Sequence, residues 1–225
     1  MKVNRTLIKI GIICIALNDS GTGATTAALG SIAAAMPFVA PALIQMIATA
    51  PTIFQAIFNL VYGKTVDFVR KKTWLYIGGL AFVIGGVGPA FFHSDIWVIL
   101  LFRAILGIGV GILVPMATDL CVDFFEGNER NSMMGFISAF MALSGVIFQM
   151  LGGYLCGIKW EYTFYAYLIS IVFLAIAFFT LPEPDRSAKI KAEVEANVNI
   201  KLTTGAIVHA LIFFFFGLFW FIGPT

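Results

Sequence analysis

Charged side chains are scarce in this sequence. Asp, Glu, Lys and Arg together make up 12% of the 225 residues, whereas soluble domains average about 25%. Hydrophobic residues account for 60%, and the mean hydropathy is +0.96. This composition excludes a water-soluble globular domain and predicts an integral membrane protein. The net charge of +2 is too small to indicate a partner made of nucleic acid.

Cysteine and histidine are also rare. Cys14, Cys121 and Cys156 are odd in number, lie in or beside apolar runs and have no metal-binding spacing, so neither a disulfide framework nor a metal site is predicted. The only histidines are His93 and His209, and the G-x-S-x-G and H-E-x-x-H motifs are missing. We therefore expect no cofactor, no metal and no catalytic residue, and the protein is predicted not to be an enzyme.

Long apolar runs dominate the chain, and seven of them reach the roughly 20 residues that a membrane-spanning helix needs. A polar segment with two prolines near its start separates the sixth run from the seventh. We predict a six-helix membrane domain over 1–182, a cytoplasmic linker over 183–202 and the start of another membrane domain over 203–225. The predicted fold is all-α, with spans near residues 6–32, 41–63, 73–92, 95–119, 132–156, 162–181 and 203–222.

Lysine and arginine are unevenly distributed between the predicted loops. If the N-terminus is cytoplasmic, all of the 14 basic residues except Lys159 and Arg103 fall in cytoplasmic segments. We therefore predict a multi-pass protein of the cytoplasmic membrane with its N-terminus inside. The alternative for the first segment is a cleaved leader, because "MKVNR" precedes an apolar core at 10–17, although Lys9 interrupts that core.

A charged stretch between the second and third runs carries a family resemblance. "GKTVDFVRKK" (63–72) resembles the signature G-x-L-A-D-R-x-G-R-K of the major facilitator superfamily. Gly63, Asp67, Lys71 and Lys72 match at the right spacing, whereas Arg70 replaces the usual glycine. The alternative is a cytoplasmic anchor, which needs only the basic residues.

Three further stretches carry the same resemblance. They are "RAILGIGVG" (103–111), "EGNERNSMMG" (126–135) and "WEYTFYAYLISIVFLAIAFFTLPEP" (160–184). The resemblance implies a six-helix N-terminal half built from two inverted three-helix repeats, with alternating access to a central site. It also implies that the seventh run opens a C-terminal half, which we expect in the full-length protein.

Asp19 is predicted to lie within the membrane. A first helix that ended at Leu17 would be too short to cross, so the span has to include Asn18 and Asp19. Helix rise places Asp19 and Arg103 at similar depths, and the resemblance puts both helices beside the central cavity. We interpret Asp19 as a proton- or cation-binding carboxylate that Arg103 holds ionised. The alternatives are a static ion pair or an Asp19 that caps a broken helix. Asn18 is a secondary candidate for hydrogen bonding to substrate.

The family resemblance implies a cytoplasmic latch that opens in every transport cycle. Asp67 occupies the latch position, and Lys71 is placed to reach Asp123 or, as second choice, Asp119. We expect a solvent-exposed pair, worth at most about 1 kcal/mol. Charges that are merely solvated at the membrane surface are the alternative.

The fifth predicted helix departs from the family's exporter pattern, G-x-x-x-G-P-x-x-G-G. In "SGVIFQMLGGYL" (144–155), Gly152 and Gly153 match the final pair, but Phe148 and Gln149 replace Gly-Pro. Gln149 is interpreted as a polar residue of the cavity or as an interhelical hydrogen-bonding group. Import and export both remain open.

We predict a secondary active transporter of a small organic solute, proton-coupled and a candidate drug or metabolite exporter. Its partners would be the lipid bilayer, the solute and protons. The alternatives are a non-transporting membrane scaffold or inactive half-transporter, and an importer of a sugar or organic anion. A retinal protein is excluded because residues 207–223 contain no lysine.

Overall fold

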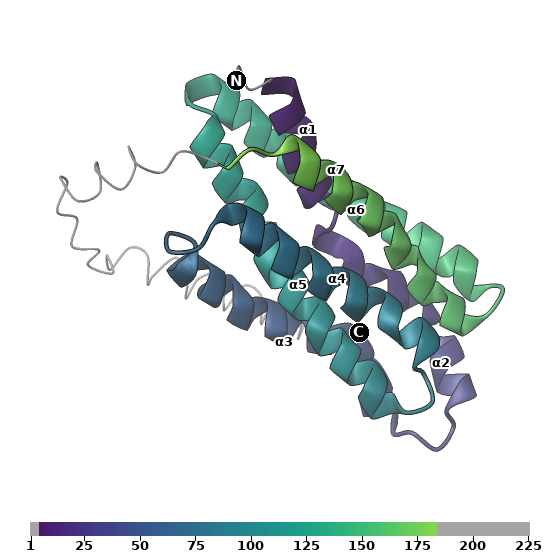
Figure 1. Ribbon diagram of the computed structural model, residues 1–225. Coiled ribbons are helices and arrows are strands. Elements are labelled where there is room, and N and C mark those ends of the chain that lie inside the picture. Colours follow the sequence, from purple (N-terminus) through teal and green to yellow (C-terminus); the bar gives the residue numbers. More distant parts are fainter. Residues whose placement is uncertain (1–4, 184–225) are drawn as a thin grey trace, which may run out of the picture. The chain divides into compact units, whose positions relative to one another are not determined.

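The structure, a computed structural model, describes residues 5–183 (Figure 1). Six helical segments in this range are long and apolar enough to cross a membrane. They confirm the first six predicted spans, whereas the predicted seventh helix and all of the predicted linker except Glu183 lie outside the described residues. The segments are Arg5–Ala35, Pro41–Thr65, Lys71–Phe91, Ile96–Phe124, Gly127–Cys156 and Trp160–Thr180.

The first span is broken near its middle. Helix α1 (Arg5–Ala16) ends before Asn18, a 3₁₀ helix η1 follows over Asp19–Ala28, and α2 (Leu29–Ala35) completes the crossing. The Asn18 side-chain amide donates to the Cys14 carbonyl at 2.8 Å, which satisfies an acceptor at the end of α1. The segment η1 is itself kinked, because Ser20 has non-helical backbone angles (φ −91°, ψ 21°). The polar stretch therefore does lie within a spanning segment, but not in a regular α-helix.

The other spans are α3 (Pro41–Thr65), α4 (Lys71–Phe91), α5 (Ile96–Phe124), α6 (Gly127–Cys156) and the pair η2 (Trp160–Leu168) and α7 (Ile169–Thr180). The predicted loop at 123–132 is wrong, because residues 125–126 alone separate α5 from α6. The Arg130 side chain explains the difference. Its Nε donates to the Phe125 carbonyl at 2.8 Å, so the loop charge caps the end of α5.

Helix α5 lies between α3 and α4, and its glycines allow both contacts (Figure 1). Gly107 and Gly111 face α3, where a Cβ on Gly111 would lie 2.7 Å from the Gln55 carbonyl oxygen. Gly109 faces α4, where a Cβ would lie 2.5 Å from the Phe82 backbone nitrogen. The "GIGVG" pattern therefore serves close backbone packing on two opposite faces.

Helix α6 packs against η1 by the same principle. A Cβ on Gly152 would collide with the Ala24 carbonyl, so only glycine permits this approach. Gly153, the second glycine of the matched pair, faces Ala27 at an ordinary contact distance of 3.8 Å. Further contacts join α1 to α7, α4 to η2 and η1 to η2.

We predict that Gly109→Ala destabilises the bundle. The added methyl would meet backbone atoms of α4, which cannot move aside as a side chain can, and such overpacking costs about 1–3 kcal/mol. Gly135→Ala is the matched control, because a Cβ there meets nothing within 4 Å. Thermal unfolding in detergent, followed by size-exclusion chromatography, should show a lower midpoint for Gly109→Ala alone. Equal midpoints would contradict the packing role of Gly109.

Candidate functional site

Asp19 begins η1 and is half-buried in the middle of the first span. Its carboxylate accepts a hydrogen bond from the Ser20 hydroxyl at 3.1 Å, and that hydroxyl also lies 3.3 Å from the Met141 carbonyl of α6. The Ser20 backbone N–H donates to the Ser144 hydroxyl at 3.2 Å, which fixes the start of η1 against α6. Within residues 5–183 no ion pair involves Asp19.

Arg103 of α5 is fully buried, and aromatic side chains enclose it. Its Nη1 donates to the Tyr167 hydroxyl of η2 at 2.8 Å. The guanidinium carbon lies 5.2 Å from the ring centres of both Phe164 and Tyr167, within the range of cation–π attraction. Nε and Nη2 are buried without a hydrogen-bond partner among the described residues. The site therefore holds a positive charge with two unused donors.

The predicted ion pair between Asp19 and Arg103 is not formed in this structure. Tyr167 occupies the intervening position, since it bonds Arg103 while its ring lies 3.5 Å from where a Cβ on Gly21 would sit. Phe82 also packs against Gly21. Sequence depth alone does not reveal this arrangement, because equal depth says nothing about which side chains fill the space between two helices.

The two amide candidates occupy different positions. Asn18 is fully buried and its Nδ2 bonds the end of α1, so the interpretation that a broken helix is capped here applies to Asn18 and not to Asp19. Gln149 is exposed on α6 and faces η1, where its side chain lies 3.4 Å from where a Cβ on Gly23 would sit. Gln149 therefore lies along the same η1 surface as Asp19.

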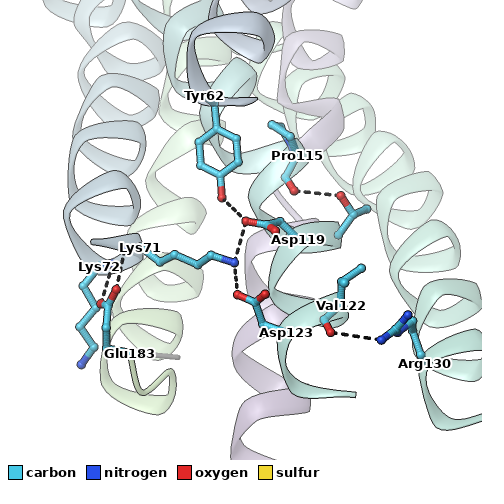
Figure 2. Close-up of polar contacts among 10 residues, drawn as sticks. Tyr62, Lys71, Lys72, Pro115, Asp119, Val122, Asp123, Arg130 and Glu183 are labelled. Atoms are coloured by element: carbon cyan, nitrogen blue, oxygen red, sulfur yellow. Dashed lines mark hydrogen bonds and ion pairs between the residues drawn. The ribbon is translucent and has the colours of Figure 1, made fainter. Parts of the chain in front are cut away.

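A second polar cluster, the Lys71 cluster, lies where α3 and α5 end and α4 begins (Figure 2). The Lys71 ammonium pairs with Asp119 at 2.6 Å and also contacts Asp123, while the Tyr62 hydroxyl donates to Asp119 at 3.0 Å. The structure thus joins Lys71 to both of the acids that the sequence offers as its partners. The Lys71 side chain is only 3% exposed, so the expectation of a solvent-exposed pair is wrong.

The Lys71 cluster continues into the start of α4. The Glu183 carboxylate accepts hydrogen bonds from the backbone N–H groups of Lys71 at 2.7 Å and Lys72 at 3.2 Å (Figure 2). A carboxylate at this position satisfies free N–H groups and interacts favourably with the helix dipole. Glu183, from the "LPEP" stretch after α7, therefore ties the end of the sixth span to the beginning of the third.

Gly63, Asp67 and Arg70 of the predicted gating loop are exposed, whereas Lys72 is half-buried. Asp67, in the predicted latch position, makes no ion pair or hydrogen bond with the rest of residues 5–183. Arg70 is the exposed N-cap residue of α4, and Gly63 lies on an open face near the end of α3, with nothing within 4 Å of its Cβ position. The structure therefore divides the loop into the buried Lys71, the half-buried Lys72 and three exposed residues.

Sequence reasoning missed Tyr167, Tyr62 and Glu183. A tyrosine in an apolar helix gives no sign of which buried group its hydroxyl will meet, and this holds for Tyr167. Tyr62 directly precedes the motif glycine, and Glu183 lies inside the Pro-Glu-Pro stretch that supports the family resemblance. Tyr62 and Glu183 therefore lie next to or inside stretches that support the family resemblance, but these stretches do not indicate which residues the two side chains contact.

Six apolar spans, a broken first helix and charges buried between helices define a multi-pass membrane protein with a polar site inside its bundle. A profile of the Major Facilitator Superfamily matches residues 10–225, and the chain belongs to this family. The family consists of membrane transporters and not of enzymes, in agreement with the sequence prediction.

Curated relatives align over about half of the chain. Multidrug transporter protein MdtP of Bacillus subtilis (strain 168) is 28% identical over 51% of the chain and 22% of its own length. Multidrug resistance protein 3 of the same organism is 34% identical over 47% of the chain and 20% of its own length. Protein TsgA of Escherichia coli O157:H7 (strain EC4115 / EHEC) is 32% identical over 51% and 29%. The chain therefore covers less than a third of these relatives.

Solved structures share the fold. The crystal structure of a D-xylose-proton symporter has a TM-score of 0.66 and 16% identity, covering 89% of this chain and 54% of the symporter. The inward-open conformation of the xylose transporter XylE from E. coli has a TM-score of 0.68 and 17% identity, with 91% and 55% covered. The chain thus spans about half of these transporters.

We predict that Lys71→Met strongly destabilises the protein, because it leaves two carboxylates without their cation in a largely buried cluster. Breaking such a pair costs about 3 kcal/mol, which corresponds to a drop of roughly 6–12 °C in the unfolding midpoint. Lys72→Met is the matched control, because the neighbouring Lys72 ammonium contacts the Phe178 ring instead of an acid. A drop of equal size in both variants, measured by thermal unfolding in detergent, would contradict this assignment.

Proposed function

We propose that the chain forms the N-terminal half of a proton-coupled secondary transporter for a small organic solute. Asp19 would bind the coupling proton, and Arg103 would respond to its charge. The observation that carries this proposal is a half-buried carboxylate in the middle of a membrane span, with no ion pair in the described part of the chain. An ionised carboxylate in that position is unfavourable unless it meets water, a partner or a proton.

The broken first span supports a binding role for this segment. Discontinuous helices near the middle of the membrane form the substrate and ion sites of many transporters, because they free backbone groups for binding. Here the break lies at Leu17 and Asn18, directly before Asp19, and η1 continues with small and hydroxylated residues. Gln149 of α6 faces the same surface and is proposed as a polar residue of the solute site. A scaffold without transport would have no use for such a segment.

Transport by alternating access needs a second body that moves against the first. The chain covers 54% of the solved xylose symporter, which is consistent with one of two halves. We therefore propose that it works with a C-terminal half. We further propose that the Lys71 cluster braces the ends of α3, α4 and α5 within this half. The exposed Asp67 and Arg70 would supply the latch toward the other half.

The direction of transport and the class of solute follow from weaker observations. Two curated relatives carry multidrug names, and this favours export of a lipophilic compound from the cytoplasm across the cytoplasmic membrane. The second candidate is import of a sugar or organic anion, which the replacement of the exporter Gly-Pro by Phe148 and Gln149 favours. In both proposals the N-terminus is cytoplasmic, as the distribution of basic residues predicts.

We predict that Asp19→Asn abolishes proton-driven transport, because an amide cannot take up and release the coupling proton. The measurement uses the intact transporter that contains this chain, reconstituted in liposomes with an imposed pH gradient. Uptake of ethidium and of D-xylose, assayed in both directions, serves as the test for a lipophilic cation and a sugar. Accumulation should vanish in Asp19→Asn, while exchange of solute without a gradient persists.

Asp95→Asn is the matched control for this experiment. Asp95 is the N-cap residue of α5, where its carboxylate accepts from the Trp97 backbone N–H at 3.1 Å, and asparagine caps a helix equally well. Gradient-driven accumulation should survive this second Asp→Asn change. Accumulation that persists in Asp19→Asn would overturn the proposed proton site.

A further inference from the structure

Arg103 leaves one edge of its guanidinium unused. Nη1 bonds Tyr167, whereas Nε and Nη2 are fully buried without a partner in the described residues. Buried polar groups are nearly always hydrogen-bonded, so each exception needs an explanation. The N–H groups on Nε and Nη2 point in parallel from the same edge, which is the geometry that binds a carboxylate through both oxygens. The unused edge is therefore shaped for an acid.

The described spans offer one acid for that edge. No charged side chain lies in α4 after Lys72 or in α6 after Arg130, so neither helix supplies a second charge near Arg103. Three of the other acids within the spans have basic partners: Glu129 contacts Arg5 and Lys9, and Asp119 and Asp123 contact Lys71. Glu161 keeps one buried oxygen without a hydrogen-bond partner, but it lies in the first turn of η2, six residues before Tyr167, with its other oxygen 3.8 Å from His93. Asp19 is the remaining carboxylate, and it has no ion pair in residues 5–183.

Tyr167 connects Arg103 to the segment that carries Asp19. Its hydroxyl bonds Arg103, and its ring packs beside Gly21, two residues after Asp19. The rings of Phe82 and Phe148 hold the tyrosine in place, with centroids 5.9 Å and 5.6 Å away. Tyr167 itself carries no charge, so it can hold the guanidinium without requiring a carboxylate.

We propose that Tyr167 is a positioning residue that competes with Asp19 for Arg103. When Asp19 is ionised, Arg103 turns its free edge to the carboxylate, and because Tyr167 stands between the two residues, this turn breaks the bond between Nη1 and the Tyr167 hydroxyl. When Asp19 takes a proton from water and becomes neutral, Arg103 returns to the Tyr167 hydroxyl, as in this structure. Only Asp19 gains or loses a proton in this exchange. The change in its charge decides which group accepts the N–H bonds of Arg103. The proposal rests on the proposed function of Asp19 as the proton site.

The test follows the protonation of Asp19 directly and needs neither a substrate nor a gradient. The intact transporter that contains this chain is purified and reconstituted in phospholipid vesicles, and infrared spectroscopy records the carbonyl band of protonated carboxyl groups during a pH titration. The part of the band that disappears in Asp19→Asn belongs to Asp19. Its midpoint is then measured in Tyr167→Phe, which removes the hydroxyl and keeps the ring.

We expect Tyr167→Phe to move the midpoint to lower pH by about one unit, which corresponds to a tenfold change in the balance between the two partners of Arg103. The direction follows because the substitution removes the partner of Arg103 in the protonated arrangement and leaves the partner in the ionised arrangement intact. Tyr165→Phe is the control, because Tyr165 lies on the same helix but packs against Phe91 and Tyr162, away from Arg103. Its midpoint should not move.

Each outcome separates the two proposals. Equal midpoints in Tyr167→Phe and Tyr165→Phe would overturn the role of Tyr167 and leave the transport proposal intact. A carboxyl band that Asp19→Asn leaves unchanged would overturn the proton site itself. Should Tyr167→Phe fail to fold, replacement of all tyrosines by 3-fluorotyrosine provides the same test, since its oxygen is a weaker acceptor. That replacement should lower the midpoint in the unsubstituted chain, and an unchanged midpoint would overturn the proposal.

Discussion

A positive charge that water does not reach has to be satisfied by the protein, and Arg103 imposes this requirement on the whole bundle. Its helix approaches α3 and α4 so closely that glycine is needed on both faces, which leaves no room for solvent. The guanidinium is therefore held by the Tyr167 hydroxyl and by aromatic faces from η2. The tight packing of α5 and the aromatic lining of Arg103 are thus two consequences of the same burial.

Charged groups have different roles at the two levels of the bundle. Around Lys71, two carboxylates, a tyrosine and the capped start of α4 form a mutually satisfied cluster that ties three helix ends together. Around Asp19 and Arg103, donors and a carboxylate remain only partly satisfied. Satisfied networks make a structure rigid, whereas unsatisfied groups can exchange partners. The arrangement would suit the proposed transport cycle, in which this half moves as one body and Asp19 changes its protonation.

Much of the fold could be predicted from the sequence, because membrane crossing requires long apolar runs and the basic residues gather in the loops between them. The first six spans matched these signals closely. The loop predicted at 123–132 was longer than the one in the structure. The reason is that the charged Arg130 side chain caps α5 and is not simply solvated at the membrane surface. Length also placed Asp19 inside the first span, but it gave no sign of the 3₁₀ geometry, which depends on how η1 packs against α6.

The sequence by itself determined that the chain crosses the membrane and that Asp19 and Arg103 lie within it, and it offered two acids of the fourth span as possible partners of Lys71. Composition, length and motif spacing carry that information. Only the tertiary structure decided which groups touch: Tyr167 stands between Asp19 and Arg103, and the Lys71 ion pairs are buried. The reason is physical, because depth along a helix follows from counting residues, whereas contacts depend on how the helices rotate and pack around their glycines.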